Sequence, residues 1–260
     1  MVRIIALLIL LLLPNLAAAD ACLGNPDALG TARILAVNAT ATPQIGRKQF
    51  PQTLPLAPRE VVLTFDDGPA PGTTGRVLDA LKHECVSATF FLVGRNALEY
   101  PALVRRASAE GHSIGHHTYS HPLLDRMLPA AAEAEIDRGI AADESVLYSR
   151  PAAKPLTPFF RFPGFASTPY LLERLADRRI VVFGADLWAS DWNIMSPEQE
   201  LRLMLDRLAA TGGGIVLFHD TRAQTAAMLP AFLRELKRGG YRVVHVIPSP
   251  APALAAAYRR

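Results

Sequence analysis

Two histidines separated by three residues form the first candidate for chemistry in this sequence. His117 and His121 end the segment His-Thr-Tyr-Ser-His, and positions i and i+4 share one side of a helical or turn backbone. Two imidazoles placed in this way can bind one metal ion. Because Pro122 follows directly, we expect a loop or a short turn here rather than a long helix.

A pair of aspartates offers the carboxylates that such a site needs. Asp66 and Asp67 come directly after the apolar run Val61–Phe65 and are followed by Gly68-Pro69. Adjacent side chains at the end of a strand point in different directions, so one carboxylate can bind a metal while the other faces a water molecule. Two imidazoles and one carboxylate form a three-ligand zinc set with an open position. The alternative interpretation of this segment is an ordinary acidic β-turn.

Further residues have two interpretations each. His219 follows the apolar run Ile215–Phe218 and is either a general acid or a hydrogen-bonded structural residue. Trp188 and Trp192 lie in a loop-like segment, 186–193, where they either face a sugar or pack inside the protein. The other histidines are expected at surface or structural positions: His83, His112, His116 and His245.

Short apolar runs alternate with longer amphipathic segments from Glu60 onward. This alternation predicts a parallel sheet with helical crossovers, either an open doubly wound sheet or a closed barrel. The first turn of a helix tolerates proline, as at Pro129 and Pro197. Strands are expected at Val61–Phe65, Ala88–Val93, His112–Gly115, Phe159–Arg161, Ile180–Ala185, Gly214–Phe218 and Tyr241–Val246. Helices are expected near 73–83, 96–109, 129–148, 168–178, 197–211 and 222–238.

Titratable residues gather at the predicted carboxyl end of one strand after another. Parallel α/β folds place their active sites at this edge of the sheet. The sequence therefore predicts an active site at this edge, where the gathered residues are Asp66, Asp67, His116, His117, His121, Arg161, Asp186, Asp191, His219 and Asp220.

The amino terminus predicts export. Arg3 precedes the apolar run Ile4–Leu13, and Ala17-Ala18-Ala19 forms a cleavage signal, so we expect a signal peptide over residues 1–19. The apolar run falls short of the ~20 residues of a membrane-spanning helix, so no stable membrane span is expected.

The sequence contains 2 cysteines, Cys22 and Cys85. Disulfides persist in oxidising compartments, so in an exported chain we expect both cysteines to have a structural role. Our hypothesis is a disulfide between Cys22 and Cys85. A lipid on Cys22 is a weaker alternative, because Ala19-Asp20-Ala21-Cys22 loosely resembles a lipidation signal.

Composition sets the remaining limits. A length of 260 residues allows one large domain or two small ones with a substantial core, and half of the residues are hydrophobic. The formal net charge is only +3 and no basic cluster of five or more occurs, so nucleic-acid binding is not expected. We expect an extension and proline-spaced linker over residues 20–59, a domain over 60–248 and a tail over 249–260.

Five ordered motifs resemble those of the NodB-homology polysaccharide deacetylases, carbohydrate esterase family 4. The third motif carries Gly164 where the family often has an aromatic residue, and Trp188 is not at the family's usual tryptophan spacing. The motifs are Thr64-Phe65-Asp66-Asp67-Gly68-Pro69, His117-Thr118-Tyr119-Ser120-His121-Pro122, Arg161-Phe162-Pro163-Gly164, Asp191-Trp192 and Leu217-Phe218-His219-Asp220.

The resemblance implies a distorted (β/α) barrel of about seven parallel strands and a role for each motif residue. A divalent metal, usually zinc, would be bound by Asp67, His117 and His121. Asp66 would be the general base, oriented by Arg161. His219 would protonate the departing amine, assisted by Asp191 or, at a competing position, Asp186. A backbone N–H near Pro163-Gly164 would stabilise the oxyanion, and Trp188 and Trp192 would face the substrate.

The activity implied is removal of N-acetyl groups from an N-acetylglucosamine-type glycan. Peptidoglycan, chitooligosaccharide and exopolysaccharide all offer the same acetamido group, and the sequence does not choose among them. Nor does ligand type separate Zn²⁺ from Co²⁺ or Ni²⁺. The alternatives are an O-acetyl polysaccharide esterase and a glycan-binding module with a decayed site.

Overall fold

The computed structural model describes residue 22, residues 24–148 and residues 155–249. The predicted signal peptide over residues 1–19 lies outside the described residues, and so do residues 250–260 of the predicted tail. Within the described residues, no helix is both long and apolar enough to cross a membrane.

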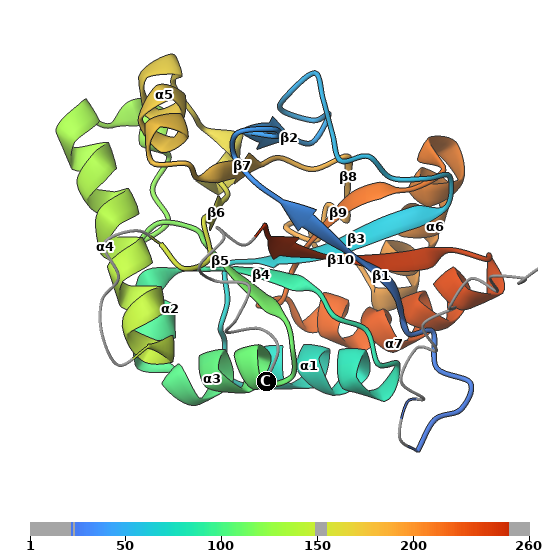
Figure 1. The fold of residues 1–260 in the computed structure, drawn as a ribbon. Helices are drawn as coiled ribbons and strands as arrows, with labels where there is room; N and C mark the ends of the chain where they lie inside the picture. Colours follow the sequence, from blue (N-terminus) through green and yellow to red (C-terminus); the bar gives the residue numbers. More distant parts are fainter. Residues whose placement is uncertain (1–21, 23, 149–154, 250–260) are drawn as a thin grey trace, which may run out of the picture.

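Ten strands form one sheet in which paired strands run parallel (Figure 1). Seven of them follow one another in the order β8-β9-β3-β4-β5-β6-β7. In the described part of the chain β7 pairs with β6 and β2 rather than with β8, so the ring is open there. This is the distorted α/β barrel that the family resemblance implies, and it decides between the open sheet and the barrel that the strand–helix alternation left open. The strands are β1 (Thr31–Val37), β2 (Gln44–Ile45), β3 (Glu60–Asp66), β4 (Thr89–Leu92), β5 (Ser113–His116), β6 (Phe159–Phe160), β7 (Val181–Phe183), β8 (Leu187–Trp188), β9 (Gly214–His219) and β10 (Arg242–Pro248).

Helices connect the strands and cover the outside of the sheet (Figure 1). Pro129 and Pro197 begin two of them, as predicted. Ser196 and Gln199 form a capping box at the second, in which each side chain accepts the other's backbone N–H. The helices are α1 (Thr74–His83), α2 (Gly94–Glu99), α3 (Pro101–Ala109), α4 (Pro129–Leu147), α5 (Pro169–Asp177), α6 (Pro197–Thr211) and α7 (Ala223–Arg238), with short 3₁₀ turns η1 (Leu124–Arg126) and η2 (Pro163–Phe165).

The helix expected over 96–109 is two helices. α2 ends at Glu99 and α3 begins at Pro101, with Tyr100 between them at φ −123° and ψ 56°. Proline disfavours the helical conformation of the residue before it, so Pro101 ends one helix and begins the next.

The segment before residue 60, expected to be an extension and linker, contributes two strands to the sheet. β1 lies beside β10, and β2 lies beside β7. Val37, Ile45 and Leu54 are buried in one apolar cluster with residues of β7 and β10. The strand predicted over Tyr241–Val246 is β10, and it lies between β1 and β3 rather than in the row of seven strands. The seventh strand of that row is β8, which pairs with β9.

Alternation along β3 separates core packing from chemistry. Successive side chains of a strand point to opposite faces. Phe65 stacks between Phe90 and Phe218 in the cluster beneath the helices, at ring-centroid distances of 5.0 and 5.6 Å. Thr64 and Asp66 point to the other face, where both contact the guanidinium of Arg161.

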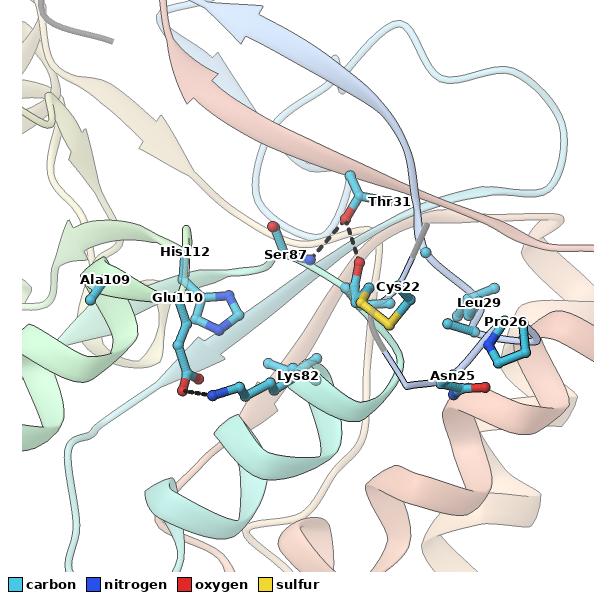
Figure 2. A pocket seen from close by; sticks show the side chains of 15 residues that line it. Cys22, Asn25, Pro26, Leu29, Thr31, Lys82, Ser87, Ala109, Glu110 and His112 are labelled. Carbon is cyan, nitrogen blue, oxygen red and sulfur yellow. Dashed lines mark hydrogen bonds and ion pairs between the residues drawn. A yellow bond between two sulfur atoms is a disulfide. The ribbon is translucent and has the colours of Figure 1, made fainter. Parts of the chain in front are cut away.

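A disulfide joins Cys22 to Cys85, which confirms the pairing hypothesis (Figure 2). It attaches the amino-terminal segment to the end of α1, beside Thr31, whose hydroxyl accepts the Ser87 N–H at 2.8 Å. Lipid attachment at Cys22 is ruled out in this state, because its sulfur is already bonded to Cys85.

Removing this bridge should destabilise the fold. The bridge joins positions 63 residues apart, and a disulfide restricts the unfolded chain more strongly as the enclosed loop lengthens. We expect Cys22→Ser with Cys85→Ser to lower the free energy of unfolding by about 2–4 kcal/mol. Urea titrations of both proteins measure the change, and equal midpoints would contradict the expected role.

Candidate active site and metal centre

Strand register brings the predicted site residues to one edge of the sheet. Asp66 ends β3 and lies opposite His219, which ends β9. On neighbouring strands, His116 of β5 lies opposite Phe160 of β6, so the residues that follow them leave the sheet side by side. The polar residues gather at the carboxyl ends of parallel strands because the register aligns those ends.

Asp67, His117 and His121 form the one group of potential metal ligands found among the described residues. One ligand atom from each lies within 4.8 Å of the others. Asp67 Oδ1 is 3.1 Å from His121 Nε2 and 3.5 Å from His117 Nε2. The segment between the histidines is a bent loop with Thr118 and His121 at φ 65°, which agrees with the expected loop or short turn and excludes a helix.

These three side chains fit a divalent cation. His117 Nδ1 lies 2.7 Å from the Arg161 carbonyl oxygen, and donating to it leaves the Nε2 lone pair facing Asp67. Asp67 Oδ1 is buried and has no hydrogen-bond partner among the described residues. Acceptor atoms that face one another need a positive charge between them. One carboxylate and two imidazoles are the donor types of a three-ligand zinc site.

Electrostatics favour ionised Asp67. Burial disfavours its charge, but the His117 and His121 imidazoles outweigh that penalty and hold the pKa of Asp67 well below its usual range. In the opposite direction, Asp67 raises the pKa of His121. Asn96 donates to the Asp67 backbone carbonyl at 2.9 Å and fixes the turn that carries the carboxylate.

Arg161 anchors the neighbouring aspartate. Its Nη1 donates to Asp66 Oδ1 at 2.7 Å and to Thr64 Oγ1 at 2.8 Å, while Nη2 donates to the Gly184 carbonyl at 2.8 Å. Arg161 is completely buried and its guanidinium lies 4.3 Å from the Phe91 ring centroid. Asp66 Oδ2 remains free of this clamp and lies 3.9 Å from His117 Nε2. The Asp66 carboxylate therefore has one fixed oxygen and one that faces the candidate metal ligands.

Breaking this buried ion pair should be costly. Arg161→Met leaves the Asp66 carboxylate, 2 % exposed, without its cation, so we expect the free energy of unfolding to fall by about 3–5 kcal/mol. Urea denaturation measures it. Arg174→Met, which removes an exposed arginine, is the matched control and should leave stability nearly unchanged. If both variants lost the same free energy of unfolding, the Arg161–Asp66 pair would not contribute more to stability than an exposed ion pair.

Asp191, rather than Asp186, contacts His219. Asp191 Oδ1 lies 2.7 Å from His219 Nδ1, and Oδ2 accepts the His219 backbone N–H at 2.7 Å. Burial opposes protonation of His219, but Asp191 outweighs it and raises the pKa of His219 to about 9. His219 Nε2 lies 4.0 Å from Asp67 Oδ2, so this second ring nitrogen faces the candidate metal ligands.

Asp186 has a structural role. Its carboxylate accepts the Arg47 backbone N–H at 3.0 Å, the Thr53 hydroxyl at 2.7 Å and the Ile215 backbone N–H at 2.8 Å. These bonds attach the amino-terminal segment to β9. Sequence spacing alone left two candidates open because both aspartates follow the same predicted strand.

The aromatic residues form a continuous row beside His219. Ring centroids are 6.1 Å apart from Phe165 to Trp188, 5.8 Å from Trp188 to Trp192 and 6.0 Å from Trp192 to His219. Trp192 is 47 % exposed, whereas part of Trp188 lies under Lys48, whose Nζ is 4.7 Å from the ring centroid. Trp188 belongs to the short strand β8, within the segment expected to be a loop.

The Pro163-Gly164 turn follows β6 and Arg161. Gly164 has a left-handed backbone at φ 57°, and a Cβ there would approach Leu123 Cδ2 to 3.0 Å, which places this turn against the loop that carries His121. Pro163 is buried and has no N–H, so any backbone donor of the turn begins at Gly164.

Comparison with known proteins identifies the family. Residues 54–180 match the sequence profile described as "Polysaccharide deacetylase". A chitooligosaccharide deacetylase from Bradyrhizobium is 33 % identical over 210 residues, covering 73 % of this chain and 90 % of that protein. The chain belongs to the polysaccharide deacetylase family. The resemblance to carbohydrate esterase family 4 inferred from the motifs is thereby confirmed.

Other members of the family differ from this chain in length. The peptidoglycan-N-acetylglucosamine deacetylase of Listeria monocytogenes is 33 % identical over 188 residues, which are 72 % of this chain but 38 % of that protein. This chain thus matches well under half of that relative. The solved structure of a Bdellovibrio bacteriovorus peptidoglycan deacetylase superposes with a TM-score of 0.74 at 32 % identity, covering 85 % of this chain and 60 % of that one.

The sequence motifs did not identify the residues that support the site residues through hydrogen bonds, directly or through one another. Thr225 and Glu200 lie beyond Asp191, at the starts of α7 and α6, and Asn96 supports the Asp67 turn. None of them stands in a polar cluster at a strand end, which is the pattern that marks the other site residues. Their positions depend on how the helices pack, and the pattern of polar residues at strand ends does not predict helix packing.

Proposed function

We propose that this protein is an exported, metal-dependent hydrolase that removes N-acetyl groups from N-acetylglucosamine-type glycans such as peptidoglycan, chitooligosaccharide or exopolysaccharide. The observation that carries the proposal is the convergence of Asp67, His117 and His121, with Asp66 on one side and His219 on the other. Family membership supports the same reaction type, since relatives are named peptidoglycan and chitooligosaccharide deacetylases.

Asp67, His117 and His121 would hold the cation, which we assign as Zn²⁺, with Co²⁺ and Ni²⁺ as alternatives for these ligand types. When bound, such a cation supplies a water of lowered pKa and polarises a carbonyl oxygen. The second-sphere bond from His117 to the Arg161 carbonyl supports this assignment, because it fixes which ring nitrogen faces the cation.

Asp66 acts as the general base in the proposed reaction. Arg161 and Thr64 hold its position through Oδ1, so Oδ2 is the oxygen that takes a proton from the attacking water. The new bond forms between that water's oxygen and the acetyl carbon. The Gly164 backbone N–H is proposed to donate to the oxygen that becomes negative.

His219 acts as the general acid. An amine leaves poorly unless it is protonated, and the raised pKa of His219, about 9, keeps a proton on the ring at neutral pH. With Nδ1 bonded to Asp191, the proton on Nε2 passes to the amine nitrogen as the C–N bond breaks. The products are acetate and a free amino sugar. Trp192, exposed beside His219, is proposed to pack against a sugar ring.

Export is part of the proposal. The disulfide Cys22–Cys85 requires an oxidising compartment to persist, and glycans of the cell wall lie outside the cytoplasm.

Acetate release tests the proposed function directly. The purified protein, loaded with Zn²⁺, Co²⁺ or Ni²⁺, is offered chitooligosaccharides, purified peptidoglycan and O-acetylated xylan side by side, with Asp66→Asn as the control. The proposal expects acetate from the N-acetylated glycans and a large loss in the variant. Release from the ester alone would favour the esterase, and a bound ion without any release would favour a glycan-binding module.

A further inference from the structure

A second layer of buried polar groups lies behind Asp191. The Asp191 carboxylate is fully buried and accepts two N–H groups from His219. Its Oδ2 is also 2.9 Å from the hydroxyl of Thr225, at the start of α7. The same hydroxyl lies 2.9 Å from Oε1 of Glu200, which comes from the first turns of α6.

Counting hydrogens assigns a proton to this group. The Thr225 hydroxyl has a single hydrogen, yet it is at hydrogen-bond distance from two carboxyl groups. Two ionised carboxylates would both need that hydrogen. Both Asp191 oxygens already accept N–H groups, which favours its ionised form. Glu200 is therefore the carboxyl that carries its own proton and donates it to the Thr225 oxygen.

The surroundings of Glu200 agree with a neutral side chain. Glu200 is completely buried, and its Oε2 has no hydrogen-bond partner among the described residues. A buried carboxylate with an oxygen left unpaired is costly. The charged groups facing it are Asp191, from the loop after β8, and His219, at the end of β9. Burial comes first among the causes that raise the pKa of Glu200 to about 7, and repulsion from Asp191 adds to it.

We propose that protonated Glu200 is a positioning residue of the deacetylase site, acting through Thr225 to hold Asp191 ionised and aligned on His219. The inference rests on the proposed role of His219 as the general acid. In this arrangement Glu200 donates to Thr225, Thr225 donates to Asp191, and Asp191 accepts from His219. Ionised Glu200 would take the Thr225 hydrogen for itself, and Asp191 would lose one of its three donors.

The proton on Glu200 can be observed without any turnover. Infrared spectra of the metal-loaded enzyme at pH 6 are compared for the native chain, Glu200→Gln and Glu198→Gln. Glu198 lies on the same first turn of α6 but is exposed, so it is the matched control. We expect a protonated-carboxyl band in the native enzyme that weakens in Glu200→Gln and persists in Glu198→Gln. An unchanged band in Glu200→Gln would overturn the proposal.

Kinetics test the positioning role. Thr225→Val should lower kcat about 10- to 100-fold, the usual scale for groups that orient a site residue, with KM unchanged. Thr225→Ser keeps the hydroxyl and should restore kcat to within about twofold of native. Glu200→Gln should retain most of kcat at pH 6 and lack the decline that the native enzyme shows as pH passes about 7.

Each result bears on a different claim. Native kcat in Thr225→Val, or a Glu200→Gln pH profile identical to that of the native enzyme, overturns the positioning role. A native enzyme that releases no acetate from any glycan refutes the proposed function instead, while the infrared comparison still reports whether Glu200 is protonated. If Thr225→Val does not fold, the pH profile of kcat for Glu200→Gln, with Glu198→Gln as its control, tests the positioning role.

Discussion

Asp66→Asn should retain the bound divalent metal and lose acetate release by about 10³-fold, whereas His117→Ala should lose both. Asn keeps the shape of the Asp66 side chain and an oxygen for Arg161, but it cannot take a proton from water. His117 Nε2 lies 3.5 Å from Asp67 Oδ1, and its loss leaves two ligands for the cation. Metal content per chain, measured by mass spectrometry, and acetate release separate the two effects.

The controls for this pair lie elsewhere on the chain. His83→Ala removes an exposed histidine outside the ligand group, and Asp177→Asn removes an exposed aspartate at the end of α5. Both should keep metal and activity. Thermal unfolding of all four variants confirms that each is folded. Asp66→Asn at the native rate would refute the base assignment, and a full metal complement in His117→Ala would refute the ligand set.

The sequence predicted most of the barrel because its apolar runs are short and strongly bounded. The runs from Val61–Phe65 onward are largely buried between neighbouring strands and helices, so apolar residues mark the positions of these strands. β1, β2 and β8 were not predicted. β2 and β8 have two residues each, and β1 exposes Ile34 at the sheet surface, so local pattern carries little information about them. Their pairing is decided by tertiary contacts.

The site was more predictable than its support. Strand-end residues such as Asp66 and His219 stand directly after apolar runs, and parallel register brings such positions to one edge. The sequence does not decide between Asp186 and Asp191, because the difference is which carboxylate turns toward His219 and which toward Thr53 in the folded chain. Glu200 lay outside any sequence signal, since only the packing of α6 against α7 brings it to Thr225.

Asp191→Asn should lower kcat by about 10³- to 10⁴-fold and move the alkaline limit of activity to lower pH. The carboxylate holds His219 in the tautomer that exposes Nε2, and it outweighs burial to raise the pKa of His219 from 6.5 to about 9. Without that charge, burial still lowers the pKa of His219 and only Asp67 and Asp66 raise it, so we expect His219 to lose its proton at a lower pH than in the native chain. The part of the alkaline decline that follows deprotonation of His219 should therefore lie at lower pH in the variant than in the native enzyme, where the pKa of His219 is about 9. Profiles of kcat/KM against pH for Asp191→Asn and for the structural control Asp186→Asn measure the shift. An unmoved alkaline limit in Asp191→Asn would mean that His219 is not the acid whose proton the reaction requires.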